Sequence, residues 1–152
     1  MTDVRKVYFG RQNMSDVFFW TREFDVRRDT LCDVSMLRAV AKVEVNTTDV
    51  VPAEVGSMYF IISKGSFYFN PVVGLGVSSG NYTETVAVPD SLVGSPGCFS
   101  FYTFPTADSV KASVVLEAML KGNKGVYCKR EFADVALVRN AIVRFTGEFF
   151  KK

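Results

Sequence analysis

Histidine is absent from this chain of 152 residues, and its absence removes several kinds of chemistry. Imidazole is the commonest general base near neutral pH and the commonest protein ligand of transition metals. Catalytic arrangements of the Ser-His-Asp and Cys-His types are excluded outright. We therefore expect no enzyme activity, no cofactor and no metal site in this chain.

Cysteine is scarce, with three residues, Cys32, Cys98 and Cys128, spread along the chain. They form no CxxC pair, so their spacing does not predict a zinc site. An odd number leaves at least one thiol free. We expect the cysteines to be buried and to behave as small hydrophobic residues, with a single disulfide as the alternative.

Long apolar runs and clusters of charge are missing as well. No stretch reaches the roughly 20 apolar residues that cross a bilayer, and residues 1–13 lack the apolar core of a signal peptide. The 18 basic and 16 acidic residues are interspersed, with a net charge of +2 and no basic stripe of the kind that binds nucleic acid. We expect no transmembrane segment, no nucleic-acid partner, and a cytoplasmic location unless the chain is a mature or truncated form.

Apolar and aromatic residues are abundant, at 48% and 14% of the sequence. Aromatic and β-branched side chains favour strands, and much of the chain alternates with a period of two. In residues 37–45 (LRAVAKVEV), apolar side chains share one face while Arg38, Lys42 and Glu44 lie on the other, which predicts a half-buried strand. Residues 58–63 (MYFIIS) are apolar on both faces, as in a strand inside a sheet or beneath a partner.

Further segments continue this alternating pattern. Strands are expected at residues 66–70, 83–88, 99–104, 110–120, 126–132 and 141–150. Lys64-Gly65 is a plausible hairpin turn, and residues 110–120 would also tolerate a helix, although the strict alternation favours a strand. About seven to nine short strands separated by turn residues predict an all-β fold, with residues 31–152 forming one antiparallel β-sandwich.

Residues 1–30 differ in character and are interpreted as an N-terminal arm. They contain a dense apolar cluster made of Val17, Phe18, Phe19, Trp20 and Phe24. Each large apolar side chain gains ~1.5–3 kcal/mol on burial, so we expect this segment to dock as a strand on the sandwich of its own subunit or of a neighbour. Arg27 and Arg28 follow as an exposed link, because adjacent guanidinium groups resist burial without partners.

Three segments together resemble the fimbrillin-like (FimA/Mfa-like) subunits of type V pili. They are residues 36–45 (MLRAVAKVEV), residues 99–107 (FSFYTFPTA), and Leu137-Val138-Arg139-Asn140 leading into residues 141–148. The family has an L-R-x-V-A-K-V strand, a later strand that ends in F-P, and R-N before a closing strand. All three patterns occur here in the same order, and they cover roughly residues 36–150.

The resemblance implies a transthyretin-like β-sandwich in a structural or adhesive subunit of a bacterial fimbrium, associated with the outer membrane. Such subunits assemble as homo- or hetero-polymers by β-strand exchange, after an Arg-specific protease removes an N-terminal strand. Arg27 and Arg28 lie where that processing would occur, between the arm and residues 36–45. The chain departs from typical members, which have two sandwich domains and an acylated lipoprotein signal, because it has room for one domain and shows no lipobox.

Two other interpretations stay open. A virion or phage structural protein with a β-sandwich fold is favoured by the starting Met and the missing signal peptide. A module that binds carbohydrate or another small ligand would use Trp20 and surface tyrosines. The position of the start codon in the gene discriminates the first two, because an upstream lipoprotein signal belongs to a pilin.

Limited trypsin treatment should cut the chain first near Arg27 and Arg28, because this link is expected to be exposed. The released arm should stay bound to the remaining fragment until denaturant is added, since its apolar cluster is expected to be docked. Gel filtration of the cut protein with and without urea measures this. Native Trp20 fluorescence with the maximum of a fully water-exposed indole would contradict the docking.

Overall fold

The structure, a computed structural model, describes residues 5–9, 14–23, 31–77 and 80–151. The described residues form twelve strands and two 3-10 turns, which confirms the all-β fold. The strands are β1 (Val7–Tyr8), β2 (Phe18–Phe19), β3 (Leu37–Arg38), β4 (Ala41–Val50), β5 (Val55–Ile62), β6 (Tyr68–Asn70), β7 (Leu75–Gly76), β8 (Tyr82–Ala87), β9 (Pro96–Thr103), β10 (Ser109–Leu120), β11 (Val126–Val138) and β12 (Ile142–Gly147). The turns are η1 (Asp90–Leu92) and η2 (Lys121–Asn123), and neither is long or apolar enough to cross a membrane.

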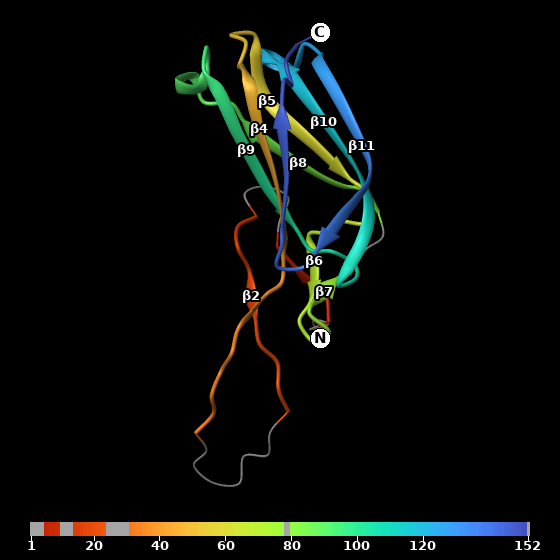
Figure 1. Cartoon of the computed structure of the whole chain (residues 1–152). Helices are drawn as coiled ribbons and strands as arrows, with labels where there is room; N and C mark the ends of the chain where they lie inside the picture. The colour runs from red at the N-terminus through yellow and green to blue at the C-terminus, as the bar shows by residue number, and fades with distance from the viewer. Residues whose placement is uncertain (1–4, 10–13, 24–30, 78–79, 152) are drawn as a thin grey trace.

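Two sheets form the sandwich (Figure 1). One has the strand order β11-β10-β5-β8 and the other the order β12-β4-β9. Neighbouring strands are antiparallel, except that β12 lies parallel to β4. The parallel pair arises because the chain leaves β11 at the end of the sandwich where β4 begins, and the N–H of Asn140 there donates to the carbonyl oxygen of Val40 at 2.9 Å.

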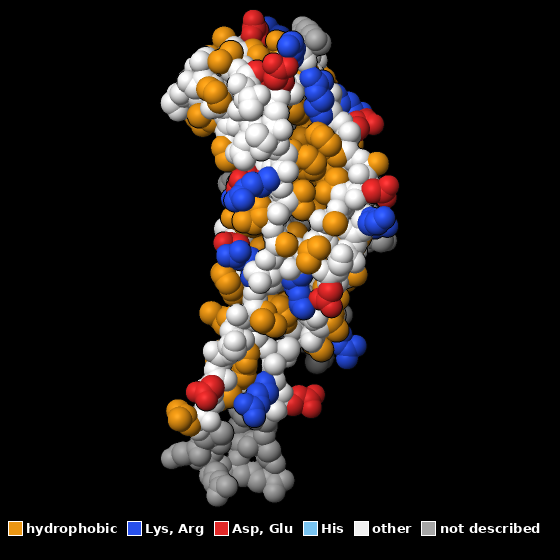
Figure 2. Space-filling model, in the orientation of Figure 1, with side chains coloured by type: hydrophobic (Ala, Val, Ile, Leu, Met, Phe, Trp, Pro, Cys, Tyr) orange, Lys and Arg blue, Asp and Glu red, His pale blue; other side chains and the backbone are white. Residues whose placement is uncertain are grey.

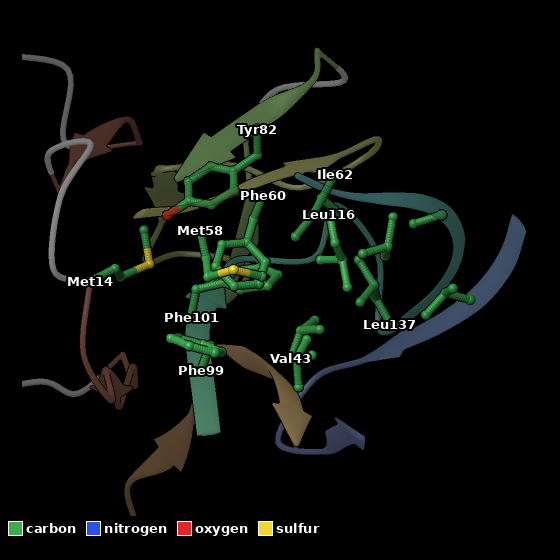
Figure 3. Packing of buried hydrophobic residues seen from close by; sticks show 14 of the residues in the cluster. Met14, Val43, Met58, Phe60, Ile62, Tyr82, Phe99, Phe101, Leu116 and Leu137 are labelled. Carbon is green, nitrogen blue, oxygen red and sulfur yellow. The ribbon is translucent and has the colours of Figure 1, made fainter. Parts of the chain in front are cut away.

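The core lies between the two sheets, and the alternation of β5 shows how the sequence builds it. Met58, Phe60 and Ile62 are fully buried, whereas Tyr59 and Ile61 lie half-buried on the outer face of the same strand. The Phe60 ring packs on Phe101 of β9 in the opposite sheet, with 4.3 Å between ring centroids. Figure 3 shows these side chains converging between the sheets.

The strand predicted for residues 110–120 is confirmed as β10, so the helical alternative is wrong. The predicted hairpin turn at Lys64-Gly65 is also wrong, because β6 pairs with β1 and β7 and not with β5. The turn instead crosses between sheets: the N–H of Ser66 donates to Oγ1 of Thr103 at 3.0 Å. A β-carbon at Gly65 would lie 2.5 Å from that same Oγ1, so only glycine fits this close approach.

The N-terminal segment contacts the sandwich through β1 and Met14, and then continues into a projecting element. β1 adds to the edge of β6, and Met14 inserts into the core. Residues 17–23 and 31–38 then form what we call the ribbon, two antiparallel legs that pair through β2 and β3. Figure 1 shows the ribbon projecting from one end of the sandwich, while β12 leads to the C-terminal segment at the other end.

Truncating Phe60 to alanine should lower the free energy of unfolding by ~3–5 kcal/mol, because it removes a fully buried ring and leaves a cavity against Phe101. Ile61→Ala is the matched control in the same strand, since Ile61 is half-buried on the outer face, and it should cost less than about 2 kcal/mol. Urea unfolding of both variants measures the difference. Equal losses would contradict the assignment of the two faces.

Candidate binding groove

The side of the sandwich where β11 and β12 lie is open. Each of these strands stands at the end of its sheet, so each has one edge without a strand partner among the described residues. A groove of about 440 Å³ lies between them. Its lining consists of Val45, Asn46, Leu116, Arg130, Phe132, Arg144, Phe145, Thr146, Gly147, Glu148 and Phe149.

The floor and walls of the groove are apolar. Leu116 and Val45, buried residues of β10 and β4, lie at the base. Above them Phe132 of β11 and Phe145 of β12 stack with their ring centroids 4.2 Å apart, a contact that joins these two edge strands. Figure 2 shows a band of apolar side chains on this face of the sandwich.

A β-bulge in β11 directs the groove side chains inward. Val114 of β10 lies opposite Phe132, while Ala112, two residues earlier, lies opposite Val135, so β11 contains one extra residue. Asp134 within this step has a φ of 54°, in the left-handed region that Asp tolerates better than most residues. Because of the bulge, Phe132 before it and Val135 after it both face the sandwich interior.

The C-terminal segment closes one end of the groove. The carboxylate of Asp49 accepts hydrogen bonds from the backbone N–H groups of Phe149, Phe150 and Lys151 at 2.9, 2.6 and 3.0 Å. From the opposite sheet, Arg130 donates to the carbonyl oxygen of Lys151, and its guanidinium lies over the Phe149 ring. Residues 149–151 therefore bridge the two sheets.

Arg144, on the rim of the groove, is held by a buried carboxylate. Its Nε donates to Oε1 of Glu44 at 2.7 Å, while Nζ of Lys42 donates to Oε2 at 2.8 Å. The hydrogen bonds from Lys42 and then Arg144 lower the pKa of Glu44 from its ordinary value of 4.5 to about 2. The positive charge of Arg144 is thus fixed at the rim, with its side chain 60% exposed.

The opposite side of the sandwich, between β8 and β9, is partly filled by the N-terminal segment. Met14 and Ser15 line a smaller cavity of about 260 Å³ there. Figure 3 shows Met14 entering from outside the sheets toward Tyr82 and Met58. Tyr82 donates to Oε2 of the buried Glu84 at 2.6 Å, and burial followed by this hydrogen bond raises the pKa of Tyr82 well above its ordinary range.

The residues predicted for the docking strand are distributed between the ribbon and the core. Val17 and Phe19 pack against the core, with Phe19 on Phe69 at 5.4 Å, while Phe18 is 48% exposed and Trp20 is half-buried. β2 pairs with β3 and not with an edge of either large sheet. The remaining predicted residues, Phe24, Arg27 and Arg28, lie outside the described residues.

The three cysteines do not share one environment. Cys128 is buried as expected, with its thiol donating to the carbonyl oxygen of Phe149 at 3.4 Å. Cys98 is exposed because it alternates outward on β9 between Gly97 and Phe99, and Cys32 is half-buried on the ribbon. All three are free thiols, and the described part of the chain brings together no group of three or more side chains that could hold a metal ion.

Comparison with known proteins leaves the resemblance to fimbrillin-like pilins a prediction. Neither the family models nor the curated proteins give a match to this sequence. Inferences about function must therefore come from the geometry of the groove and the ribbon.

Removing the Glu44 carboxylate should flatten the acid dependence of stability. Because the folded pKa of about 2 lies below the ordinary 4.5, the unfolded chain binds more protons between these values. The stabilisation from Glu44 is therefore present above pH 4.5 and is lost as the pH falls toward 2. Urea unfolding from pH 6 to 2.5 should show a smaller loss for Glu44→Gln than for the unaltered protein, and parallel curves would contradict the role of this carboxylate.

Proposed function

We infer that the chain is a structural subunit that assembles by strand addition at the groove between β11 and β12. The observation that carries this inference is the groove itself, an apolar floor between two strand edges that have no strand partner in the described part of the chain. Exposed edges offer unpaired N–H and C=O groups to another extended segment. A segment with alternating apolar side chains would bury them against Leu116 and Val45 while its backbone bonds to an edge strand.

The two arginines of the groove are already bonded within the chain, which favours binding of a segment through its backbone and its apolar side chains. Arg144 is bonded to Glu44, and Arg130 is bonded to the C-terminal segment. These groups already have partners, so the floor and the strand edges remain as the main binding features. A carbohydrate-binding function centred on Trp20 lacks comparable support, because Trp20 lines neither this groove nor the cavity between β8 and β9.

The setting that fits this subunit is a bacterial fimbrium at the outer-membrane surface, as the resemblance to fimbrillin-like pilins implies, with a transthyretin-like topology and no enzymatic role. Processing at Arg27 and Arg28 would then free the segment that contains β1 and Met14. This segment is held by pairing of β1 with β6 and of β2 with β3, by burial of Met14, and by packing of Val17 and Phe19 on the core, contacts that strand exchange can replace. Its departure would uncover the side of the sandwich between β8 and β9.

Filling the groove should block assembly without unfolding the chain. A β-carbon at Gly147 would meet no atom within 4 Å, and Gly147 lines the groove, so Gly147→Tyr can place its ring there. Sedimentation velocity over a range of concentrations should show association of the unaltered protein and at least a tenfold weaker association of Gly147→Tyr.

Ile142→Tyr provides the control in the same strand, because Ile142 is 43% exposed and lies outside the groove lining. It should associate like the unaltered chain. A monomer at every concentration for the unaltered protein, or equal association of all three proteins, would overturn assembly at this groove.

A further inference from the structure

The ribbon exposes more apolar surface than an isolated subunit needs. Five large apolar side chains of its two legs are substantially exposed: Phe18 (48%), Leu31 (97%), Val34 (57%), Met36 (63%) and Leu37 (54%). Several exposed apolar side chains on one projecting element favour an interaction surface. The ribbon is therefore the feature of the described chain that most needs a partner.

The ribbon backbone is also available for pairing. Beyond the two-residue strands β2 and β3, no backbone–backbone hydrogen bond joins the described parts of the legs, residues 20–23 and 31–36. The contact recorded between these parts is a weak one, from Nη1 of Arg22 to the Cys32 sulfur at 3.7 Å. Among the described residues, 31–36 thus make no backbone–backbone hydrogen bond, and the carbonyl oxygen of Asp33 accepts one weak bond from the Cys32 thiol at 3.9 Å. Such backbone groups can pair with a sheet edge.

The side chains of this leg match the groove. Val34 and Met36 are separated by one residue, so in an extended conformation they point to the same side. The intervening Ser35 and the preceding Asp33 point the other way. With Val34 and Met36 against the apolar floor, Asp33 would face outward, toward the arginine-bearing rim at Arg144.

A ribbon does not reach the groove of its own subunit. The ribbon joins the sandwich at Val40, beside the start of β12, whereas the groove is lined by residues at the end of β12, including Gly147 and Phe149. Figure 1 shows the ribbon pointing away from that end. The two surfaces are different, so a contact of the ribbon of one copy with the groove of another would be head-to-tail, which closes into a ring or continues as an open row.

We propose that the ribbon of one copy docks, through Val34 and Met36, in the β11–β12 groove of a second copy of this chain. The proposal rests on the proposed function, because it names the partner and the segment that the groove receives. It also explains why the exposed apolar residues of the ribbon and the open groove lie at opposite ends of one subunit. Each copy then presents one ribbon and one groove to its neighbours.

The test is complementation between two variants that each lack one surface. The ribbon variant carries Val34→Asp and Met36→Asp, and the groove variant carries Gly147→Tyr. Neither should associate alone in sedimentation velocity, but an equimolar mixture should form a one-to-one pair and stop there, because one intact ribbon meets one intact groove. A control with Val72→Asp and Val73→Asp, which changes a loop of equal exposure (57% and 56%), should associate like the unaltered chain.

Each other outcome overturns the proposal in a recognisable way. If the groove variant still dimerises alone and the ribbon variant does not, the ribbons of two copies pair with each other. If the unaltered protein and both variants all associate, a different surface is used. If only the groove variant is monomeric, so that the ribbon variant still associates alone, the groove accepts another segment, and the proposed function stands without this partner. If the unaltered protein never associates, the proposed function fails together with this inference.

Folding of the variants is verified by their urea midpoints. Val34 and Met36 are more than half exposed, so the ribbon variant should unfold at the same urea concentration as the unaltered chain. Should Gly147→Tyr lower the midpoint, the smaller Gly147→Leu replaces it in the same complementation.

Discussion

The contact between Phe60 and Phe101 is the one on which the rest of the structure depends. It joins β5, in the middle of one sheet, to β9 in the other, and it sets which face of each strand is inward. Once these faces are fixed, the period-two alternation determines every other inward position along the same strands. The alternation does not determine how the four edge strands are covered. These strands lie side by side in two pairs, β8 with β9 and β11 with β12.

The edge strands on the two sides of the sandwich are covered in different ways. Between β8 and β9, the N-terminal segment supplies Met14 as a buried side chain in its own subunit. Between β11 and β12, the stacked Phe132 and Phe145 narrow the opening, but a groove of about 440 Å³ remains. This asymmetry is the reason that the proposed strand addition is placed on the β11–β12 side.

The sequence predicts the strands well where alternation is regular and less well where local geometry changes its phase. β10 follows directly from the pattern of residue types. Residues 58–63 are apolar on both faces, so the pattern predicts a strand there but does not identify Met58, Phe60 and Ile62 as the buried side chains. β11 was expected to end at Phe132, because the bulge at Asp134 shifts the alternation by one residue and hides the continuation to Val138. The sequence Lys64-Gly65 is typical of a hairpin turn. Here the chain instead crosses to the other sheet, because the N–H of Ser66 bonds to Thr103, a residue distant in sequence.

The groove could not be predicted, because its parts are far apart in the chain. Arg144 is fixed by Glu44, a hundred residues earlier, and Phe149 is fixed by Asp49 across the same interval. Nothing in the local sequence indicates these distant partners, although Lys42, on the same face of the predicted strand, also bonds to Glu44. The sequence gives one indication that the chain needs a further contact, the apolar cluster of the N-terminal arm. Only part of this cluster is buried in the structure, because Val17 and Phe19 pack on the core while Phe18 is exposed.

Charges at the groove limit indiscriminate pairing at its open edges. Arg130 faces inward on the edge strand β11, and natural sheets use such inward charges to prevent indiscriminate edge-to-edge pairing. Its guanidinium is bonded to the C-terminal segment, so one end of the groove is closed to an approaching strand. Arg144 adds a fixed positive charge on the β12 side. A segment added there, as proposed, would therefore lie beside a cationic rim and place alternate apolar side chains on the floor of the groove.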